Sequence, residues 1–334
     1  MAEKNEFIAQ LKKSVYGKGV RVVFPEAEEL RILEAAIIAQ RENLAVPILI
    51  GNQENVSQVA REHNLDISNL SIIAPDEPSY LEKYIPLQLE QSSLREGAVR
   101  RLLKKPLFFG LMMVKAGDAD AMVGGAVYET ASIIMGGTMV VGMKEGVSTP
   151  SSFFLMDIPG FQGGESGKLI FADCAVLPDP TAEELSDIAI ASAESAKAIL
   201  GCESRVAMLS FSTKGSSLEP QAEKIVQATK IVSERRPELL VDGEFQADTA
   251  IVPAIAKKKV KGESSVAGKA NVLIFPDLNS GNIAYKLVQR LANADAIGPL
   301  LQGFAKPICD LSRGATVDDI IGSIVVTAVQ AIDR

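Results

Sequence analysis

Short hydrophobic runs alternate with segments of helical periodicity along almost the whole chain. Uninterrupted runs rich in Val, Ile and Leu are typical of strands buried on both faces of a parallel sheet, whereas apolar residues at every third or fourth position indicate amphipathic helices. The alternation predicts an α/β protein. The expected strands are 21–24, 48–50, 119–123, 152–156, 168–173, 205–211, 239–241, 271–275 and 296–300. The expected helices include 29–40, 181–199, 221–235, 283–291 and 317–332.

Local signals mark where some of these helices begin and end. Thr181 and Glu184 form the Thr-x-x-Glu pattern of a capping box, and Gly201 is placed to stop the same helix. Thr316 is expected to cap the last helix, which places Asp319 at its third position. The Gly-rich segment 158–168 is expected to be a surface loop.

Composition adds size and compartment to this outline. A chain of 334 residues suggests about two domains, and 47% hydrophobic with 23% charged residues is typical of a soluble globular protein. The net charge of −8 argues against nucleic acid or an anionic membrane as a partner, so an anionic substrate needs a local basic site. The longest apolar stretch, 131–143, is too short to span a bilayer. Three widely spaced cysteines indicate reduced thiols, and we expect a cytoplasmic protein.

Histidine chemistry is nearly excluded by the sequence. The single histidine, His63, lies in a charged segment that resembles an exposed helix end. A Ser-His-Asp or Cys-His arrangement and a His-ligated metal are therefore not expected, and we predict no metal site. A catalytic base would have to be a carboxylate, Lys, Tyr or Cys.

Polar groups gather where predicted strands end, which is where α/β proteins bind anionic ligands. After the strand that ends at Phe211 comes a hydroxyl-rich turn with Lys and Gly, which is either an anion-binding nest or ordinary turn chemistry. Glu244 and Gln246 end another strand and are either ligand contacts or simple turn residues. Asn279 and Ser280 are expected first as helix caps, although they also open a helix at a strand end.

The loop before the last helix carries a further constellation. Ser312 and Arg313 could form a phosphate clamp, with a guanidinium beside a hydroxyl donor. The Asp319 carboxylate has two compatible interpretations, because a residue that caps a helix also has a fixed position for catalysis.

The chain resembles the phosphate acetyl/butyryl transferase family, and most closely its phosphate acetyltransferase branch. The resemblance rests on VVFPE, FADCA, RVAMLSFSTKGS, VDGEFQ and the segment from Asn271 to Asp319, so it covers nearly the whole chain. It implies two α/β/α domains with mainly parallel sheets and a cleft between them, as in isocitrate and isopropylmalate dehydrogenases. The first domain would comprise 1–145 plus 297–334 and the inserted second domain 146–296, in a homodimer.

The resemblance also implies an activity and residue roles. The reaction would be reversible acetyl transfer between coenzyme A and phosphate, with acetyl phosphate as the other substrate and no tightly bound cofactor. Asp319 would be the general base for the thiol, Ser312 would donate to the developing oxyanion, and Arg313 would hold the phosphate. The residues expected to bind substrate are Thr130, Ser212, Thr213, Lys214, Gly215, Ser216, Glu244, Gln246, Asn279 and Ser280.

The match breaks where the family carries arginines associated with coenzyme A. Met135 stands in place of one, and the segment 89–96 lacks an Arg-Lys-Gly motif. Other basic residues could take over, coenzyme A could bind in an altered pose, or the acyl acceptor differs. The basic candidates are Arg95, Arg100, Arg101 and Lys144. Alternatives for the whole protein are a propionyl- or butyryltransferase, or a catalytically weak homologue that binds acyl phosphate or coenzyme A.

Overall fold

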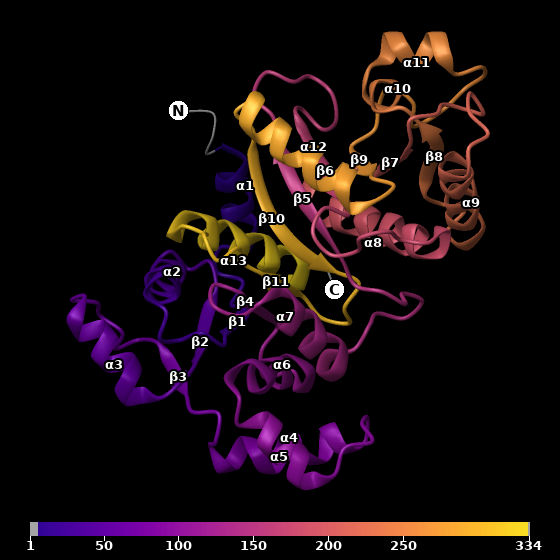
Figure 1. Ribbon diagram of the computed structural model, residues 1–334. Helices are drawn as coiled ribbons and strands as arrows, with labels where there is room; N and C mark the ends of the chain where they lie inside the picture. The colour runs from indigo at the N-terminus through magenta and orange to yellow at the C-terminus, as the bar shows by residue number, and fades with distance from the viewer. Residues whose placement is uncertain (1–5, 333–334) are drawn as a thin grey trace. The chain divides into compact units, whose positions relative to one another are not determined.

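The structure is a computed structural model that describes residues 6–332. It contains two compact units, one formed by residues 145–303 and the other by residues 6–144 together with 304–332 (Figure 1). In sequence, residues 145–303 interrupt the other unit. The domain boundaries expected from the sequence, 1–145 with 297–334 and 146–296, stay a prediction.

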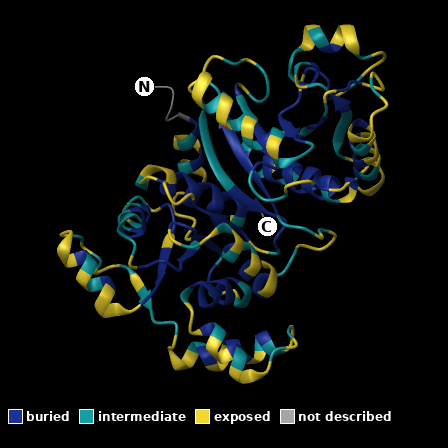
Figure 2. Cartoon of the chain, viewed as in Figure 1, coloured by how far each residue is buried: buried dark blue, intermediate teal, exposed yellow. Residues whose placement is uncertain are grey.

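The unit of residues 6–144 and 304–332 is built on five parallel strands in the order β3-β2-β1-β4-β11. The strands are β1 (Arg21–Phe24), β2 (Val46–Ile50), β3 (Ser71–Ile73), β4 (Ala121–Gly124) and β11 (Ile308–Asp310). β4 is buried along its whole length, as apolar residues on both strand faces require (Figure 2). Because the strands are parallel, their carboxyl ends meet at one edge.

Helices cover both faces of this sheet, because the chain crosses over it in opposite directions. From β1 it moves outward through α2 to β2, and from β3 it returns through α6 to β4, so right-handed crossovers place α2 and α6 on opposite faces. α13 packs beside α2. The helices are α1 (Glu6–Val15), α2 (Leu30–Arg41), α3 (Gln53–Glu62), α4 (Pro78–Leu89), α5 (Glu96–Leu103), α6 (Pro106–Ala116), α7 (Thr130–Gly136), the π-helix η2 (Gly137–Val141) and α13 (Val317–Ile332).

The unit of residues 145–303 has six strands in the order β10-β5-β6-β9-β7-β8. β5 pairs antiparallel with both β10 and β6, and the remaining pairs are parallel. The strands are β5 (Ser151–Asp157), β6 (Lys168–Ala172), β7 (Arg205–Leu209), β8 (Leu240–Phe245), β9 (Val272–Ile274) and β10 (Asp295–Gln302). The helices are α8 (Ala182–Leu200), α9 (Pro220–Arg235), α10 (Ala247–Ile251), α11 (Pro253–Lys259) and α12 (Leu278–Leu291).

The α/β class and the mainly parallel pairing predicted from the sequence are confirmed. So is the capping box of Thr181 and Glu184, with Gly201 ending α8 in the left-handed conformation. The start of α12 differs from expectation. Asp277, not Asn279 or Ser280, caps this helix, because its side chain accepts a hydrogen bond from the backbone N–H of Ser280 at 2.8 Å. Between residues 6 and 332 no helix has the length and apolar character needed to cross a membrane.

Candidate active site

The loop between β11 and α13 presents its predicted catalytic side chains to solvent. Ser312, Arg313 and Asp319 are all exposed. The capping interpretation of Asp319 is confirmed, because its Oδ2 accepts hydrogen bonds from the backbone N–H of Thr316 at 2.9 Å and from the Thr316 hydroxyl at 2.8 Å. Both bonds use one oxygen, Oδ2, and hold the carboxylate in place. Its role as a base stays a prediction.

The Arg313 guanidinium lies beside the start of α7. Its Nη2 is 3.4 Å from Oε1 of Glu129, and both side chains are more than half exposed. Exposed ion pairs of this kind contribute little stability, so an anionic ligand can displace Glu129 from Arg313 at small cost. Among the described residues, Ser312 Oγ accepts one long hydrogen bond, from the backbone N–H of Gly314 at 3.3 Å. The hydroxyl is therefore available as a donor.

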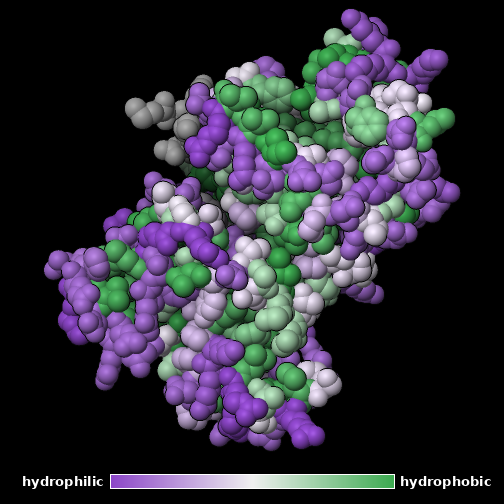
Figure 3. Space-filling model, viewed as in Figure 1, coloured by the Kyte–Doolittle hydropathy of each residue, from purple (hydrophilic) through white to green (hydrophobic). Residues whose placement is uncertain are grey.

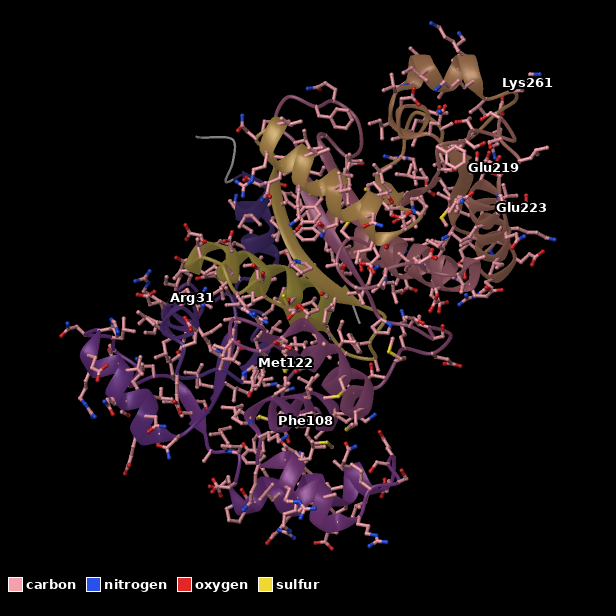
Figure 4. All side chains as sticks on the ribbon, in the orientation of Figure 1. Arg31, Phe108, Met122, Glu219, Glu223 and Lys261 are labelled. Carbon is pink, nitrogen blue, oxygen red and sulfur yellow. The ribbon has the colours of Figure 1, made fainter. Side chains whose placement is uncertain are left out.

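Arg31, which the sequence analysis missed, anchors the same loop. It projects from the first turn of α2, where it is labelled in Figure 4. Its Nη1 donates to the carbonyl oxygens of Arg313 at 2.9 Å and Ala315 at 2.8 Å. Nε of Arg31 donates to Glu29 at 2.7 Å, which orients the guanidinium. Arg31 thus fixes the backbone of the loop that contains Ser312 and Arg313. Only the Pro25-Glu26 motif near it could have drawn attention to this region.

Thr130 is one of the predicted substrate-binding residues, and its hydroxyl has a partner inside the protein. Thr130 Oγ1 donates to Oδ2 of Asp310 at 2.6 Å. The threonine begins α7, and Asp310 ends β11. The hydrogen bond joins these two elements at the carboxyl edge of the sheet, and the substrate-binding role of Thr130 stays a prediction.

In the unit of residues 145–303, the turn after β7 and the end of β8 hold each other. The Glu244 carboxylate, 2% exposed, accepts hydrogen bonds from the Ser212 hydroxyl at 2.8 Å and from the backbone N–H of Gly215 at 2.9 Å. Ser216 Oγ lies 3.1 Å from Ser212 Oγ. Burial of a carboxylate is tolerable only with such donors. This network supports the alternative of a structural turn.

Three other residues expected to bind substrate, Thr213, Lys214 and Gln246, also have partners within the protein. Lys214 Nζ binds the Asp242 carboxylate and donates to the carbonyl of Gly243 at 2.8 Å. Thr213 Oγ1 accepts from the backbone N–H of Gln246 at 3.0 Å. A phosphate in this turn would have to compete with Asp242 for Lys214. Substrate binding by these residues stays a prediction.

A hollow of about 410 Å³ lies at the carboxyl edge of the same sheet. Asn279 lines it. The backbone N–H and the hydroxyl of Ser280 both donate hydrogen bonds to Asp277 instead. Lys224, also in the lining, is bound to Asp179 at 2.8 Å. The residues that line the hollow are Pro178, Asp179, Ser210, Phe211, Gln221, Lys224, Pro276, Asp277 and Asn279.

The predicted site residues thus form two groups, one in each unit. Ser312, Arg313, Asp319 and Thr130 belong to the unit that contains α13, and the others belong to the unit of residues 145–303. Their convergence on one cleft stays a prediction. In the part of the chain that the structure describes, no group of three or more His, Cys, Asp or Glu side chains is arranged to hold a metal ion.

The fold and the site define an α/β protein with guanidinium, hydroxyl and carboxylate groups at the carboxyl ends of its strands, where such proteins take phosphorylated ligands. The family model described as "Phosphate acetyl/butaryl transferase" matches residues 6–328. The chain belongs to this phosphate acetyl/butyryl transferase family and is an acyltransferase by that membership.

Several relatives are similar to this chain over nearly their full lengths. A phosphate acetyltransferase of Thermoanaerobacterium thermosaccharolyticum is 46% identical, covering 93% of this chain and 95% of the relative. One from Acetivibrio thermocellus is 42% identical, covering 97% and 98%. A solved phosphotransacetylase from Streptococcus pyogenes superposes with a TM-score of 0.91 at 39% identity, covering 99% of each chain.

Proposed function

We propose that this protein transfers an acetyl group reversibly between coenzyme A and inorganic phosphate. The carrying observation is the exposed junction of Ser312, Arg313 and Asp319, in a chain whose relatives are named phosphate acetyltransferases. In the direction of acetyl-CoA synthesis, the sulfur of coenzyme A forms a bond to the carbonyl carbon of acetyl phosphate. The bond from that carbon to the phosphate oxygen breaks, and phosphate leaves with the electron pair.

The three side chains have complementary roles in this reaction. A thiol with a pKa near about 8.5 is mostly protonated at neutral pH, so the Asp319 carboxylate takes its proton as sulfur attacks. The Ser312 hydroxyl donates to the oxyanion that develops on the carbonyl oxygen. The Arg313 guanidinium binds the phosphate and stabilises its charge as it departs. No tightly bound cofactor or metal enters the proposed mechanism.

The part of the site proposed to bind coenzyme A lacks the arginines that the family resemblance implies. Met135 is 52% exposed on α7, where it can offer coenzyme A no charge. Arg100 and Arg101 lie in the last turn of α5, in the same unit, and we propose them as the cations that contact the coenzyme A phosphates. Arg100 is paired with Glu96 at 3.0 Å, an exposed pair that a phosphate can replace.

The proposal includes a cytoplasmic homodimer. Free cysteines with no disulfide among them fit a reducing compartment. An apolar stripe of Ile283, Leu287 and Leu291 on the outer face of α12, at least half exposed in the single chain, supports association with a second copy (Figure 3).

The function is tested by incubating the purified protein with acetyl phosphate and coenzyme A and following loss of free thiol. We expect Asp319→Asn to reduce turnover by roughly two to four orders of magnitude, the usual effect of removing a general base. Asp318→Asn, which changes the neighbouring exposed carboxylate, is the control and should keep full turnover. Equal turnover in both variants would remove Asp319 from the mechanism. Parallel assays with propionyl and butyryl phosphate determine the acyl chain length.

A further inference from the structure

Asp310 carries a buried carboxylate that the proposed mechanism does not use. Its side chain is 2% exposed, and it ends β11 two positions before Ser312. Oδ2 accepts the hydrogen bond from Thr130, whereas Oδ1 is buried with no hydrogen-bond partner among the described residues. Burying a half-partnered carboxylate is costly, so its presence beside a catalytic loop suggests a functional reason.

The segment before α7 packs directly against this carboxylate. Gly125 has a φ of +107°, and a Cβ atom placed there would lie 2.4 Å from Asp310 Oδ1. A side chain at position 125 would therefore displace the carboxylate. The backbone N–H of Leu311 donates to the carbonyl of Gly124 at 2.6 Å. The end of β11 and residues 124–125 are thus in close contact.

A second buried carboxylate holds the other side of the segment. Glu26, at the end of β1, accepts hydrogen bonds from four consecutive backbone N–H groups, those of residues 125–128, at 2.7–3.0 Å. Four donors satisfy this carboxylate fully. The segment that leads to Glu129 and Thr130 therefore lies between Glu26 and Asp310, and only Asp310 has an oxygen without a donor.

We propose that Asp310 is a positioning residue that couples the start of α7 to the Ser312–Arg313 loop. Through Thr130 it fixes the first turn of α7, so that Glu129 stands opposite Arg313 and orients the guanidinium before substrate arrives. Through the chain it fixes Leu311, the single residue between Asp310 and Ser312. This inference rests on the proposed function and adds to it a determinant of acyl phosphate binding.

The coupling has a built-in dependence on pH. Burial raises the pKa of Asp310 to about 6; the Thr130 hydroxyl opposes this rise, and the negative charge of Glu26 adds to it. The adjacent titratable group on β11 is the Cys309 thiol, whose pKa burial raises to about 12. Glu129 and Arg313, which flank this region in the chain, are exposed and paired with each other. When Asp310 gains a proton, its hydrogen bond from Thr130 weakens, because hydroxyl donors bind the charged form more strongly.

The test compares wild type, Asp310→Asn and Thr130→Val from about pH 5 to about pH 8. We expect both variants to raise the KM for acetyl phosphate about tenfold at the upper end of this range, with less than about twofold change in the KM for coenzyme A. The ratio of variant to wild type should approach one at the lower end, where wild-type Asp310 is neutral. Substrate ionisation cancels in that ratio, because all proteins use the same substrate.

Asp118→Asn is the matched control. Asp118 also accepts a hydrogen bond from a hydroxyl, that of Tyr84 at 2.7 Å, but it lies at the end of α6. This variant should change thermal stability without changing either KM. A pH-independent ratio, or equal changes in both KM values, would overturn the positioning role of Asp310. If Asp310→Asn does not fold, Thr130→Val tests the same link from the other side. A wild-type protein with no turnover would instead refute the proposed function.

Discussion

Asp310 and Asp319 belong to the same C-terminal segment and lie in opposite environments. Asp310 is enclosed at the end of β11, whereas Asp319 stands exposed in the first turn of α13. The difference arises from the neighbours and not from the side chain, since the chemical group is the same. A capped, exposed carboxylate can exchange protons with a thiol, whereas the enclosed Asp310 carboxylate holds the Thr130 side chain packed against it.

This enclosure predicts how stability depends on pH. The pKa of Asp310 is about 6 in the folded protein and about 3.9 in the unfolded chain. Below a pH of about 3.9 both states hold the proton. Between about 3.9 and about 6 the unfolded chain releases its proton while the folded protein retains it, so each rise in pH favours unfolding. Above about 6 the folded protein also loses the proton and bears the cost of a buried charge. Wild type should therefore lose stability relative to Asp310→Asn between about pH 4 and about pH 7, by at most on the order of 3 kcal/mol. Urea unfolding at several pH values measures the difference, and a pH-independent gap between the two proteins would contradict it.

At the scale of elements, the candidate site residues lie at the carboxyl ends of strands. β1, β4 and β11 deliver Glu26, Gly125 and Asp310 to one edge, and in the other unit β7 and β8 deliver Ser212 and Glu244. Parallel strands make this grouping unavoidable, because all of their carboxyl ends lie at the same side of the sheet. The helices that follow these strands begin among polar groups, so the same side chain can serve either as a helix cap or as a ligand contact.

The start of α12 gives a test of this competition. Removing a side-chain cap costs about 1 kcal/mol of stability. Asp277→Ala should therefore lower the free energy of unfolding by about that amount, whereas Asn279→Ala, at the second residue of the helix, should leave it nearly unchanged. Urea unfolding of the two variants side by side measures this. The opposite ranking would restore Asn279 as the cap.

At the scale of the whole molecule, one unit interrupts the chain of the other, and residues distant in sequence complete each sheet. The unit of residues 145–303 exposes the stripe on α12, made of Ile283, Leu287 and Leu291. Residues at this spacing lie on one side of a helix, and such a continuous apolar face is typical of an interface.

Replacing Leu287 with Glu should therefore weaken the proposed homodimer. A buried charge without a partner is costly at an interface, so we expect the sedimentation coefficient to shift from dimer to monomer at micromolar concentration. Leu218→Glu is the control, because Leu218 is 92% exposed outside any helix or strand. A dimer that survives Leu287→Glu would place the interface elsewhere.

The sequence predicted the larger elements because their signals are local. The strands predicted at 21–24 and 168–173 are observed at 21–24 and 168–172, and these strands and the helix capped by Gly201 are marked by short runs and caps within a few residues. β3 and β11 were missed because each has three residues of which only two are hydrophobic, whereas the equally short β9 is wholly apolar. α6 was missed because it is apolar on all sides and shows no helical period.

By itself, the sequence determined the α/β class, the family and the positions of Ser312, Arg313 and Asp319 in the last loop and helix, since motifs and periodicity are properties of neighbouring residues. Only the tertiary structure decided which polar groups are partners. Thr130 and Asp310 are 180 positions apart, and Ser212 meets Glu244 across two strands. Burial, which sets the pKa of Asp310 and leaves one of its oxygens without a donor, depends on what the fold packs over a residue, and no local pattern encodes that.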